Sequence, residues 1–282
     1  MLASLPMYDG WIPHRHTDRV WRAVVKRALE DHELQLPNDI DRSVSCGDAW
    51  LSPSLIFSQT CGYPLVLTYK DRLRIVGTPM YRCPGCEGTL YRSAIIASVA
   101  CTDNDLTSLL ERGPITVAAN SIDSFSGWLM LLSSIAQSFP TSISERQLSA
   151  VVRRVVWTGS HEHSIAAVRR GDAGVASIDA VSFSLAQRHA PSRSEGVRVI
   201  GWSSPAPSLP YVTGQNTSDH ELSILKKSLQ DTICDPGSEV QKSLEQLHLL
   251  GVDVSGAVGI AEYEAAVERH AELARSVCPA LG

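Results

Sequence analysis

The chain has 282 residues, 44% of them hydrophobic, and 25 basic against 30 acidic side chains give a formal net charge of −5. This hydrophobic share can bury a sizeable core and excludes a disordered chain. The mild acidity argues against a nucleic-acid partner bound through phosphate neutralisation, and no apolar run approaches the roughly 20 residues of a membrane span. We therefore expect a soluble globular protein without a membrane span.

In the first half of the chain, short apolar segments alternate with amphipathic ones. Helical periodicity over residues 17–33 places Val20, Trp21, Val24 and Val25 on one stripe. The long segment 89–100 is apolar and β-branched in its second half, which favours a strand. The pattern predicts strands at 2–7, 55–58, 73–77, 89–100 and 115–119, and helices at 17–33, 105–112 (capped by Asp103 or Asn104) and 127–139.

The second half continues this alternation and then becomes helical. Gly171 closes one predicted helix, and a proline-rich stretch follows the strand at 197–202. Strands are predicted at 152–158, 175–178 and 197–202, and helices at 163–170, 180–189, 219–232, 239–250 and 261–278. Strands alternating with helices indicate an α/β protein with mostly parallel sheets. Segments 89–100 and 197–214 could be crossings between two lobes, although a single doubly wound sheet fits the composition equally well.

The segment from Asn120 to Trp128 lies between a predicted buried strand and a predicted helix. Ser124 and Ser126 then stand at a helix N-terminus, where backbone N–H groups lack intrahelical acceptors. Gly127 permits close backbone approach. Hydroxyls, amides and the positive end of the helix dipole together suit an anion. Ordinary N-capping by serine explains the same residues about as well.

Residues 157–181 read as a strand, a Gly-Ser turn, a helix, a strand and then Asp179. Ligands of open α/β sheets lie at the carboxyl ends of the strands, so Ser160, His161 and Asp179 would face such a crevice. A metal pair of His161 and His163 is disfavoured, because zinc-binding helices place ligands four residues apart and no third ligand is apparent. We expect no metal and no cofactor.

Cys83 and Cys86 enclose Pro84 and Gly85 in a CxxC spacing typical of redox and zinc sites. A zinc site needs a second pair, and the other five cysteines are scattered. A thioredoxin-like motif would open a helix, whereas the proline and glycine here indicate a loop. Both alternatives remain open at this point.

The run TGSHEHSIAAVRRGDAGVASIDAVSF, the SFSGW turn and LYRS resemble the phosphate/phosphite/phosphonate-binding proteins of ABC importers. These proteins belong to the type 2 periplasmic-binding-protein superfamily, and the resemblance extends from the N-terminus to about residue 214. It implies two α/β lobes, joined by two crossing strands that form a hinge, with the ligand held between them. The implied lobes are 1–92 with 205–282, and 93–204.

The resemblance also implies a ligand site. Ser124 and Ser126 match the serines of the family's Ser-Thr-Ser-Gly turn, but Phe125 replaces its threonine and removes one hydroxyl donor. A small anion carrying an amine or a ring therefore becomes plausible, since Trp128 would suit a ring and acidic side chains an amine. The implied ligand-binding residues are Tyr8, Asp9, Gln59, Thr60, Tyr91, Ser124, Ser126, Gly127, Trp128, His161 and Asp179.

Three further expectations follow from the resemblance. A disulfide would pair Cys61 with Cys86, and an ABC permease would be the partner. The chain as given starts without a signal peptide, which predicts a cytoplasmic protein, or a periplasmic one if a signal was removed.

The superfamily also includes cleft enzymes of menaquinone- and thiamin-precursor synthesis. In that alternative His161, Asp179 or Cys61 would act as acid, base or nucleophile. Against it, the sequence carries no P-loop, dinucleotide-binding turn or HExxH motif. A binding protein is therefore the preferred prediction.

Overall fold

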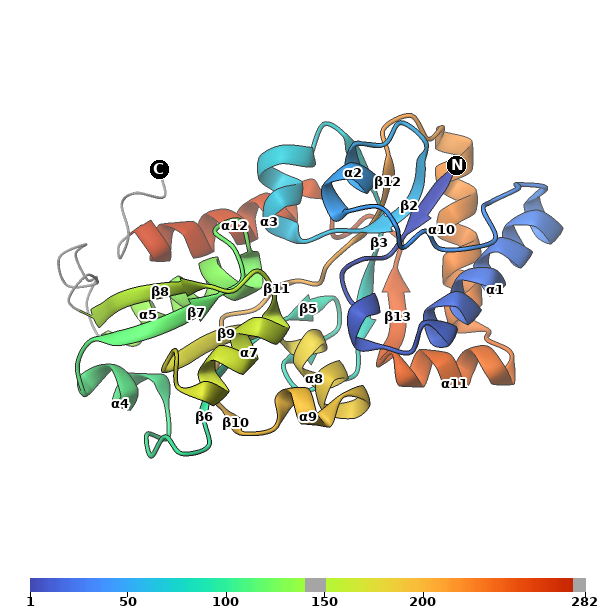
Figure 1. The fold of residues 1–282 in the computed structure, drawn as a ribbon. Coiled ribbons are helices and arrows are strands. Elements are labelled where there is room, and N and C mark those ends of the chain that lie inside the picture. Colours follow the sequence, from blue (N-terminus) through green and yellow to red (C-terminus); the bar gives the residue numbers. More distant parts are fainter. Residues whose placement is uncertain (140–150, 276–282) are drawn as a thin grey trace. The chain divides into compact units, whose positions relative to one another are not determined.

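The computed structural model describes residues 1–139 and 151–275, and the chain divides into two compact units (Figure 1). Unit 1 comprises Met1–Leu90 and Pro207–Glu264, and unit 2 comprises Tyr91–Ala206 and the segment from Ala265 onward. The implied lobe boundaries near residues 92 and 205 lie within two residues of these divisions. The last helix differs, because its part after Glu264 belongs to unit 2 and not to the lobe expected from the resemblance.

Unit 1 is built on a five-stranded sheet in the order β1-β2-β12-β3-β13. Its strands are β1 (Leu2–Ser4), β2 (Leu55–Gln59), β3 (Leu73–Tyr81), β12 (Tyr211–Gly214) and β13 (Leu249–Asp253). β1 and β2 are parallel, whereas β12 and β13 run antiparallel to their neighbours. β13 was predicted as the end of a helix at 239–250, because its short apolar run continues the helical pattern.

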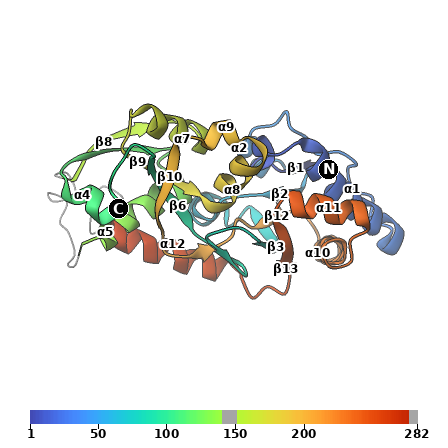
Figure 2. The ribbon, with the colours of Figure 1, turned by 90° about the horizontal axis from the view of Figure 1, so that it is seen from below.

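Helices α1 (His14–His32), α10 (Asp219–Cys234) and α11 (Ser238–Gln246) pack together in unit 1 (Figure 2). The apolar stripe of α1 contributes Trp21, whose ring stacks on Phe57 of β2, and Phe57 stacks in turn on Tyr211. A capping box of Ser218 and Glu221 fixes the start of α10. The shorter elements of unit 1 are η1 (Asp9–Trp11), α2 (Cys46–Leu51), α3 (Gly62–Pro64) and η2 (Leu65–Tyr69).

Unit 2 has its own five-stranded sheet, in the order β10-β6-β9-β7-β8. Its strands are β6 (Ser93–Ser98), β7 (Ile115–Ala119), β8 (Val152–Trp157), β9 (Val175–Asp179) and β10 (Val197–Trp202). β9, β7 and β8 are parallel to one another, while β6 is antiparallel to both β9 and β10. Both sheets are therefore mixed rather than mostly parallel, because β6 in unit 2, and β12 and β13 in unit 1, run antiparallel to their neighbours.

Helices cover both faces of the unit 2 sheet: α7 and α9 lie on one side and α5 on the other (Figure 2). Four successive residues, Leu129–Leu132, are almost entirely buried, so this helix start is apolar all round. The helical elements are α4 (Leu106–Glu111), η3 (Phe125–Leu129), α5 (Met130–Gln137), α7 (His161–Arg170), α8 (Ala180–His189) and α9 (Pro191–Ser194). The cap of α4 is Asp105, not Asp103 or Asn104.

The segment predicted as one strand at 89–100 breaks at Arg92 into β5 (Leu90–Tyr91) and β6. β5 joins β4 (Cys86–Glu87) and β11 (Ala206–Pro207) in a small sheet, and β5 and β11 each contain a point where the chain passes between units. The last helix, α12 (Ile260–Arg275), ends within the described residues, and the predicted remainder up to 278 lies outside them. None of the described helices is long and apolar enough to cross a membrane.

Candidate functional site

Three parallel strands of unit 2, β9, β7 and β8, end at one edge of the sheet and each is followed by a helix start. After β7 comes the turn that leads to η3, after β8 the turn that leads to α7, and after β9 the cap of α8. Backbone bonds tie the first two turns together, since the amides of Thr158 and Gly159 donate to the carbonyls of Ala119 and Asn120. Helix N-termini gathered at one sheet edge provide N–H donors and positive potential.

The chain does not enter a regular α-helix after β7 but forms the π-helical turn η3. The Ser124 side chain caps it by accepting from the Gly127 amide at 3.0 Å, and the Ser124 carbonyl accepts from the amides of Trp128 and Leu129. Single π turns are often found at functional sites, because the wider turn redirects side chains. The sequence predicted this segment as the beginning of an ordinary helix.

Two serines from the sheet hold the backbone of η3 in place. Ser93 of β6 and Ser177 of β9 both donate their hydroxyls to the carbonyl of Ser126, at 3.1 and 2.5 Å. Sequence reasoning missed both residues. The signal was available for Ser177, because it lies two positions before Asp179 and successive side chains of a strand alternate between its faces.

The hydroxyl of Ser126 meets the imidazole of His161, the first residue of α7, with an Oγ–Nε2 distance of 2.9 Å. Burial lowers the pKa of His161 to about 4, so the ring is neutral at pH 7. A neutral imidazole has one N–H and one acceptor nitrogen. Whichever tautomer forms, one donor of the pair, either the Ser126 hydroxyl or the His161 Nδ1–H, is left over for another acceptor.

Gly127 is required because the Asn120 side chain occupies the space where a Cβ would project. A Cβ built on Gly127 would lie 1.8 Å from Asn120 Oδ1 and 3.0 Å from Ser124 Oγ. The turn after β7 and the start of η3 are therefore packed in direct contact. Sequence reasoning included Asn120 in the motif without giving it a role.

Polar atoms without a hydrogen-bond partner among the described residues occur on three side chains of this region. They are Asn120 Oδ1, Trp128 Nε1 and His161 Nδ1, and all three are shielded from solvent. Trp128 packs edge-on against Trp157 at the end of β8, with ring centroids 5.0 Å apart. A buried polar atom left without a partner costs about 1–3 kcal/mol, so such atoms commonly mark a place where a ligand or water completes the bonding.

Asp179 and Tyr91 also lie in unit 2. Asp179 ends β9, pairs with Ser93 in the strand register, and accepts the Ser182 amide at 2.8 Å as the cap of α8. Tyr91 is 1% exposed in β5. Its neighbour Arg92 donates to the carbonyl of Ser203. His163 is exposed and its Nδ1 contacts the carbonyl of Thr158.

The remaining predicted residues lie in unit 1. Gln59, at the end of β2, donates through Nε2 to the Tyr81 hydroxyl at 3.2 Å and to the Leu209 carbonyl at 2.9 Å. Thr60 is fully buried, and its amide donates to the carbonyl of Pro210. Tyr8 packs edge-on against Tyr81 with ring centroids 5.7 Å apart. Within unit 1, Tyr81 is thus a shared contact of the Gln59 and Tyr8 side chains.

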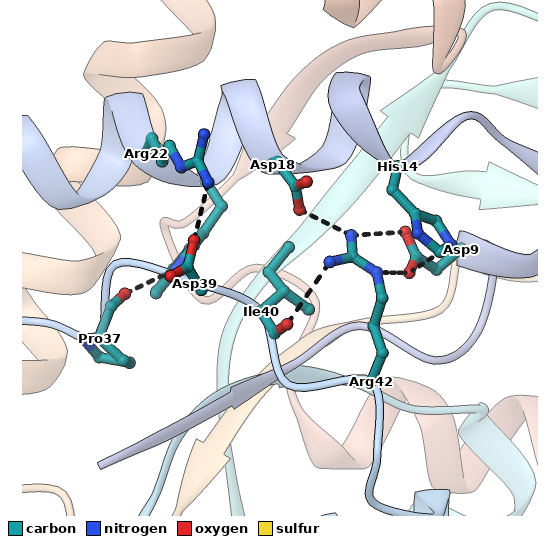
Figure 3. Close-up of polar contacts among 9 residues, drawn as sticks. Asp9, His14, Asp18, Arg22, Pro37, Asp39, Ile40 and Arg42 are labelled. Atoms are coloured by element: carbon teal, nitrogen blue, oxygen red, sulfur yellow. Dashed lines mark hydrogen bonds and ion pairs between the residues drawn. The ribbon is translucent and has the colours of Figure 1, made fainter.

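Asp9 belongs to an ion-pair network with Arg42 (Figure 3). Arg42 reaches both carboxylate oxygens of Asp9, at 2.5 and 3.3 Å, and also binds Asp18 of α1 at 2.7 Å. His14 Nε2 lies 3.6 Å from the same carboxylate. Because Arg42 lies in the loop after α1, this network ties the loop to both η1 and the start of α1.

The resemblance implied a disulfide between Cys61 and Cys86, and that pairing stays a prediction. In the structure neither cysteine is part of a disulfide, and the sulfur of Cys86 lies 3.3 Å from that of Cys83. The Pro84-Gly85 turn holds Cys83 and Cys86 close to one another. Within the described residues, no group of three or more His, Cys, Asp or Glu side chains is arranged to hold a metal ion.

Comparisons with solved structures show the fold. A binding protein component of an ABC phosphonate transporter from Pseudomonas aeruginosa is 15% identical, with a TM-score of 0.64 over 98% of this chain and 96% of that one. PhnD1 from Prochlorococcus marinus in complex with methylphosphonate is 12% identical, with a TM-score of 0.65 over 93% and 94% of the two chains. MatC from Rhodopseudomonas palustris with bound malate is 13% identical, with a TM-score of 0.54 over 98% of each chain.

The match to these structures along nearly the whole chain confirms the predicted α/β two-lobe fold. Among proteins of curated function, none matches the sequence. A family model described as the periplasmic substrate-binding protein of phosphonate ABC transporters matches residues 74–256, which is well over half of the chain. The chain therefore belongs to the phosphonate-type family of periplasmic substrate-binding proteins of ABC transporters.

Proposed function

We propose that this substrate-binding protein captures a small anionic ligand at the start of η3 in unit 2 and delivers it to the permease of an ABC importer. The observation that carries the proposal is the Ser126–His161 pair, which retains a spare donor at a helix N-terminus. The unpartnered atoms of Asn120, Trp128 and His161 in the same region support it. Membership of the family supports the role in transport.

The ligand class that suits these residues is a phosphate- or phosphonate-like anion, which can also carry an amine. The donors around Ser126 are hydroxyl, imidazole and backbone N–H groups that carry no formal charge at pH 7, so anion binding there rests on hydrogen bonds and the helix dipole. Asp179 would suit an amine, and the Trp128 indole would suit an apolar or methylated part. Solved neighbours of this fold include complexes with methylphosphonate and with malate, so a carboxylate is the competing class.

We assign further ligand contacts to Tyr91 and Asp179 in unit 2. For unit 1, Tyr8, Gln59 and Thr60 stay the ligand contacts that the resemblance implies. Gln59 would contribute through its carbonyl oxygen, since its Nε2 already donates to Tyr81 and Leu209. Both carboxylate oxygens of Asp9 already accept from the Arg42 guanidinium, so Asp9 would affect ligand binding by holding Arg42 in place.

Thermal-shift screening tests the ligand class. The purified chain is heated with phosphate, phosphite, alkylphosphonates, 2-aminoethylphosphonate, malate and adipate, each over a range of concentrations. A true ligand at a hundredfold excess over its dissociation constant stabilises the folded state by about 2.7 kcal/mol. Stabilisation by phosphonates and not by dicarboxylates supports the proposed class, and the reverse pattern contradicts it.

Ser126→Ala tests the site. It removes the hydroxyl that pairs with His161, so we expect loss of about tenfold or more in ligand affinity, as for one hydrogen bond to a charged group. Ser134→Ala is the matched control: Ser134 lies on the helix that follows and donates only to the Met130 carbonyl. If Ser126→Ala binds the ligand as tightly as Ser134→Ala does, the site is elsewhere.

One observation favours an enzyme as the second candidate. A hydroxyl 2.9 Å from an imidazole is the arrangement of a nucleophile and its base. Two features oppose this role: the pKa of His161 near 4 makes it a weak base at pH 7, and its Nδ1 has no carboxylate partner among the described residues. Turnover of a bound ligand that His161→Ala abolishes would favour the enzyme.

A further inference from the structure

The turn before β4 holds two thiols in contact. The sulfurs of Cys83 and Cys86 are 3.3 Å apart, and the Cys86 amide donates to the Cys83 carbonyl at 3.1 Å. Pro84 and Gly85 occupy the two central positions, and Gly85 has φ +88°. Proline followed by a residue with positive φ is the pattern of a type II β-turn, whose first and fourth Cα atoms lie within about 7 Å of one another.

That separation largely coincides with the Cα–Cα range of about 4.4–6.8 Å that a disulfide requires. The turn is fixed by proline, glycine and its backbone hydrogen bond, so it holds the two sulfurs together before any bond forms. Both cysteines are partly exposed, which gives a small reagent access. The contact distance between the sulfurs, the turn geometry and the exposure of both cysteines are three separate observations, and each favours a disulfide between Cys83 and Cys86.

We propose that Cys83 and Cys86 form an internal disulfide by exchange with a low-molecular-weight or protein disulfide. The thiolate of one cysteine attacks the oxidant's S–S bond, forms a mixed disulfide and expels one thiolate. The second cysteine attacks the sulfur of the first and expels the other. Two electrons pass from the pair to the oxidant, and the two thiol protons end on its two released thiols. The family's periplasmic location is a compartment where such exchange favours disulfides.

The consequence is local stiffening of the segment between β3 and β5. Cys86 is the first residue of β4, which pairs with β5, and β5 contains one of the points where the chain passes from unit 1 to unit 2. On the other side of the turn, the Arg82 amide is fixed to the His248 carbonyl. The bond would therefore close a turn whose two ends are already anchored to strands.

Peptide mapping of the full chain tests the proposal. The reduced protein is incubated with oxidised glutathione, remaining thiols are alkylated, and the chain is digested with trypsin. Cleavage after Arg82 and Arg92 places both cysteines in the peptide 83–92, whereas Cys61 falls with Cys46 in the peptide 43–70. We expect peptide 83–92 to appear without alkyl groups and two hydrogen atoms lighter than its reduced form. Its recovery cross-linked to peptide 43–70, or doubly alkylated after the oxidant, would overturn the proposal.

Three variants sharpen the result. Cys61→Ser and Cys46→Ser should form the internal disulfide as the parent does, whereas Cys83→Ser should stop at a glutathione adduct on Cys86. Gly85→Ala forces a side chain into the positive-φ position, so the oxidised fraction at a fixed glutathione ratio should correspond to an equilibrium constant about fivefold lower or more. Loss of the bond in Cys61→Ser, or an unchanged constant in Gly85→Ala, would show that the turn does not select this pair.

Discussion

Replacing Gly127 by alanine is the sharpest test of how η3 is packed. The added Cβ would lie 1.8 Å from Asn120 Oδ1 and 2.9 Å from Asn120 Cγ. Non-bonded carbon and oxygen atoms need about 3.4 Å, so the Asn120 side chain must move by more than 1 Å. Movement of Asn120 also disturbs the turn between β7 and η3.

Two contributions of opposite sign set the magnitude. Overpacking a buried site typically costs about 1–3 kcal/mol. Alanine in place of glycine within a helix otherwise stabilises by about 0.5–1 kcal/mol. We therefore expect Gly127→Ala to destabilise the chain by about 1–2 kcal/mol, and to weaken ligand binding, because η3 must shift relative to His161.

Asn120→Ala supplies the control, because it removes the side chain that clashes. In the Asn120→Ala background, Gly127→Ala should be neutral or stabilising by up to about 1 kcal/mol, so the two substitutions should show a coupling energy of about 1–3 kcal/mol. Urea denaturation of all four proteins, followed by circular dichroism, measures these differences. If Gly127→Ala is as stable as the parent, or equally destabilising with and without Asn120, the packing argument is refuted.

Two further predictions concern charge. Arg42→Ala should destabilise the chain by about 1–3 kcal/mol, because it removes the bidentate partner of the mostly buried Asp9, which keeps its contact with His14, and the ion pair of Asp18. Arg22→Ala removes an exposed ion pair and should cost less than about 1 kcal/mol (Figure 3). Equal costs of the two substitutions in urea denaturation would contradict this reasoning. Burial lowers the pKa of His270 to about 4, so as pH falls the unfolded chain binds a proton before the folded chain does. The free energy of unfolding should therefore fall by at most about 3 kcal/mol between about pH 6.5 and pH 4. His270→Asn should flatten this part of the stability–pH curve, and an unchanged slope would rule the explanation out.

Elements with strong local signals could be predicted from the sequence. The strand Ile115–Ala119, the helix Ala180–His189 and the strand Val197–Trp202 have the predicted bounds. Gly171 closes α7 in the left-handed conformation, as the sequence indicated. Each of these segments combines a clear period with a nearby stop signal, so local patterning was sufficient.

Segments whose conformation depends on distant partners were not predictable. The end of the predicted helix at 239–250 becomes β13, because β3 offers it an edge to pair with. The start of the helix after β7 becomes the π turn η3, held by Ser93 and Ser177 from other strands. The order of strands that makes both sheets mixed likewise depends on contacts between residues far apart in sequence.

In the candidate site, too, residues with a local signal were predicted, whereas contacts between distant residues were not. The sequence marked Ser124, Ser126, Gly127, His161 and Asp179, because serine, glycine and acidic residues at the junction of a strand and a helix carry a local signal. The 2.9 Å contact between Ser126 and His161 joins residues 35 positions apart, and no local pattern encodes it.

By itself, the sequence determined the alternation of strands and helices, the resemblance to the family and the capping serines, because each depends on neighbours within a few residues. Only the tertiary structure decided that Asn120 fills the space beside Gly127, that Arg42 binds Asp9, and that the sulfurs of Cys83 and Cys86 are in contact. The physical reason is that contact distances, burial and charge pairing depend on which segments pack against one another, and the packing within each unit determines those contacts.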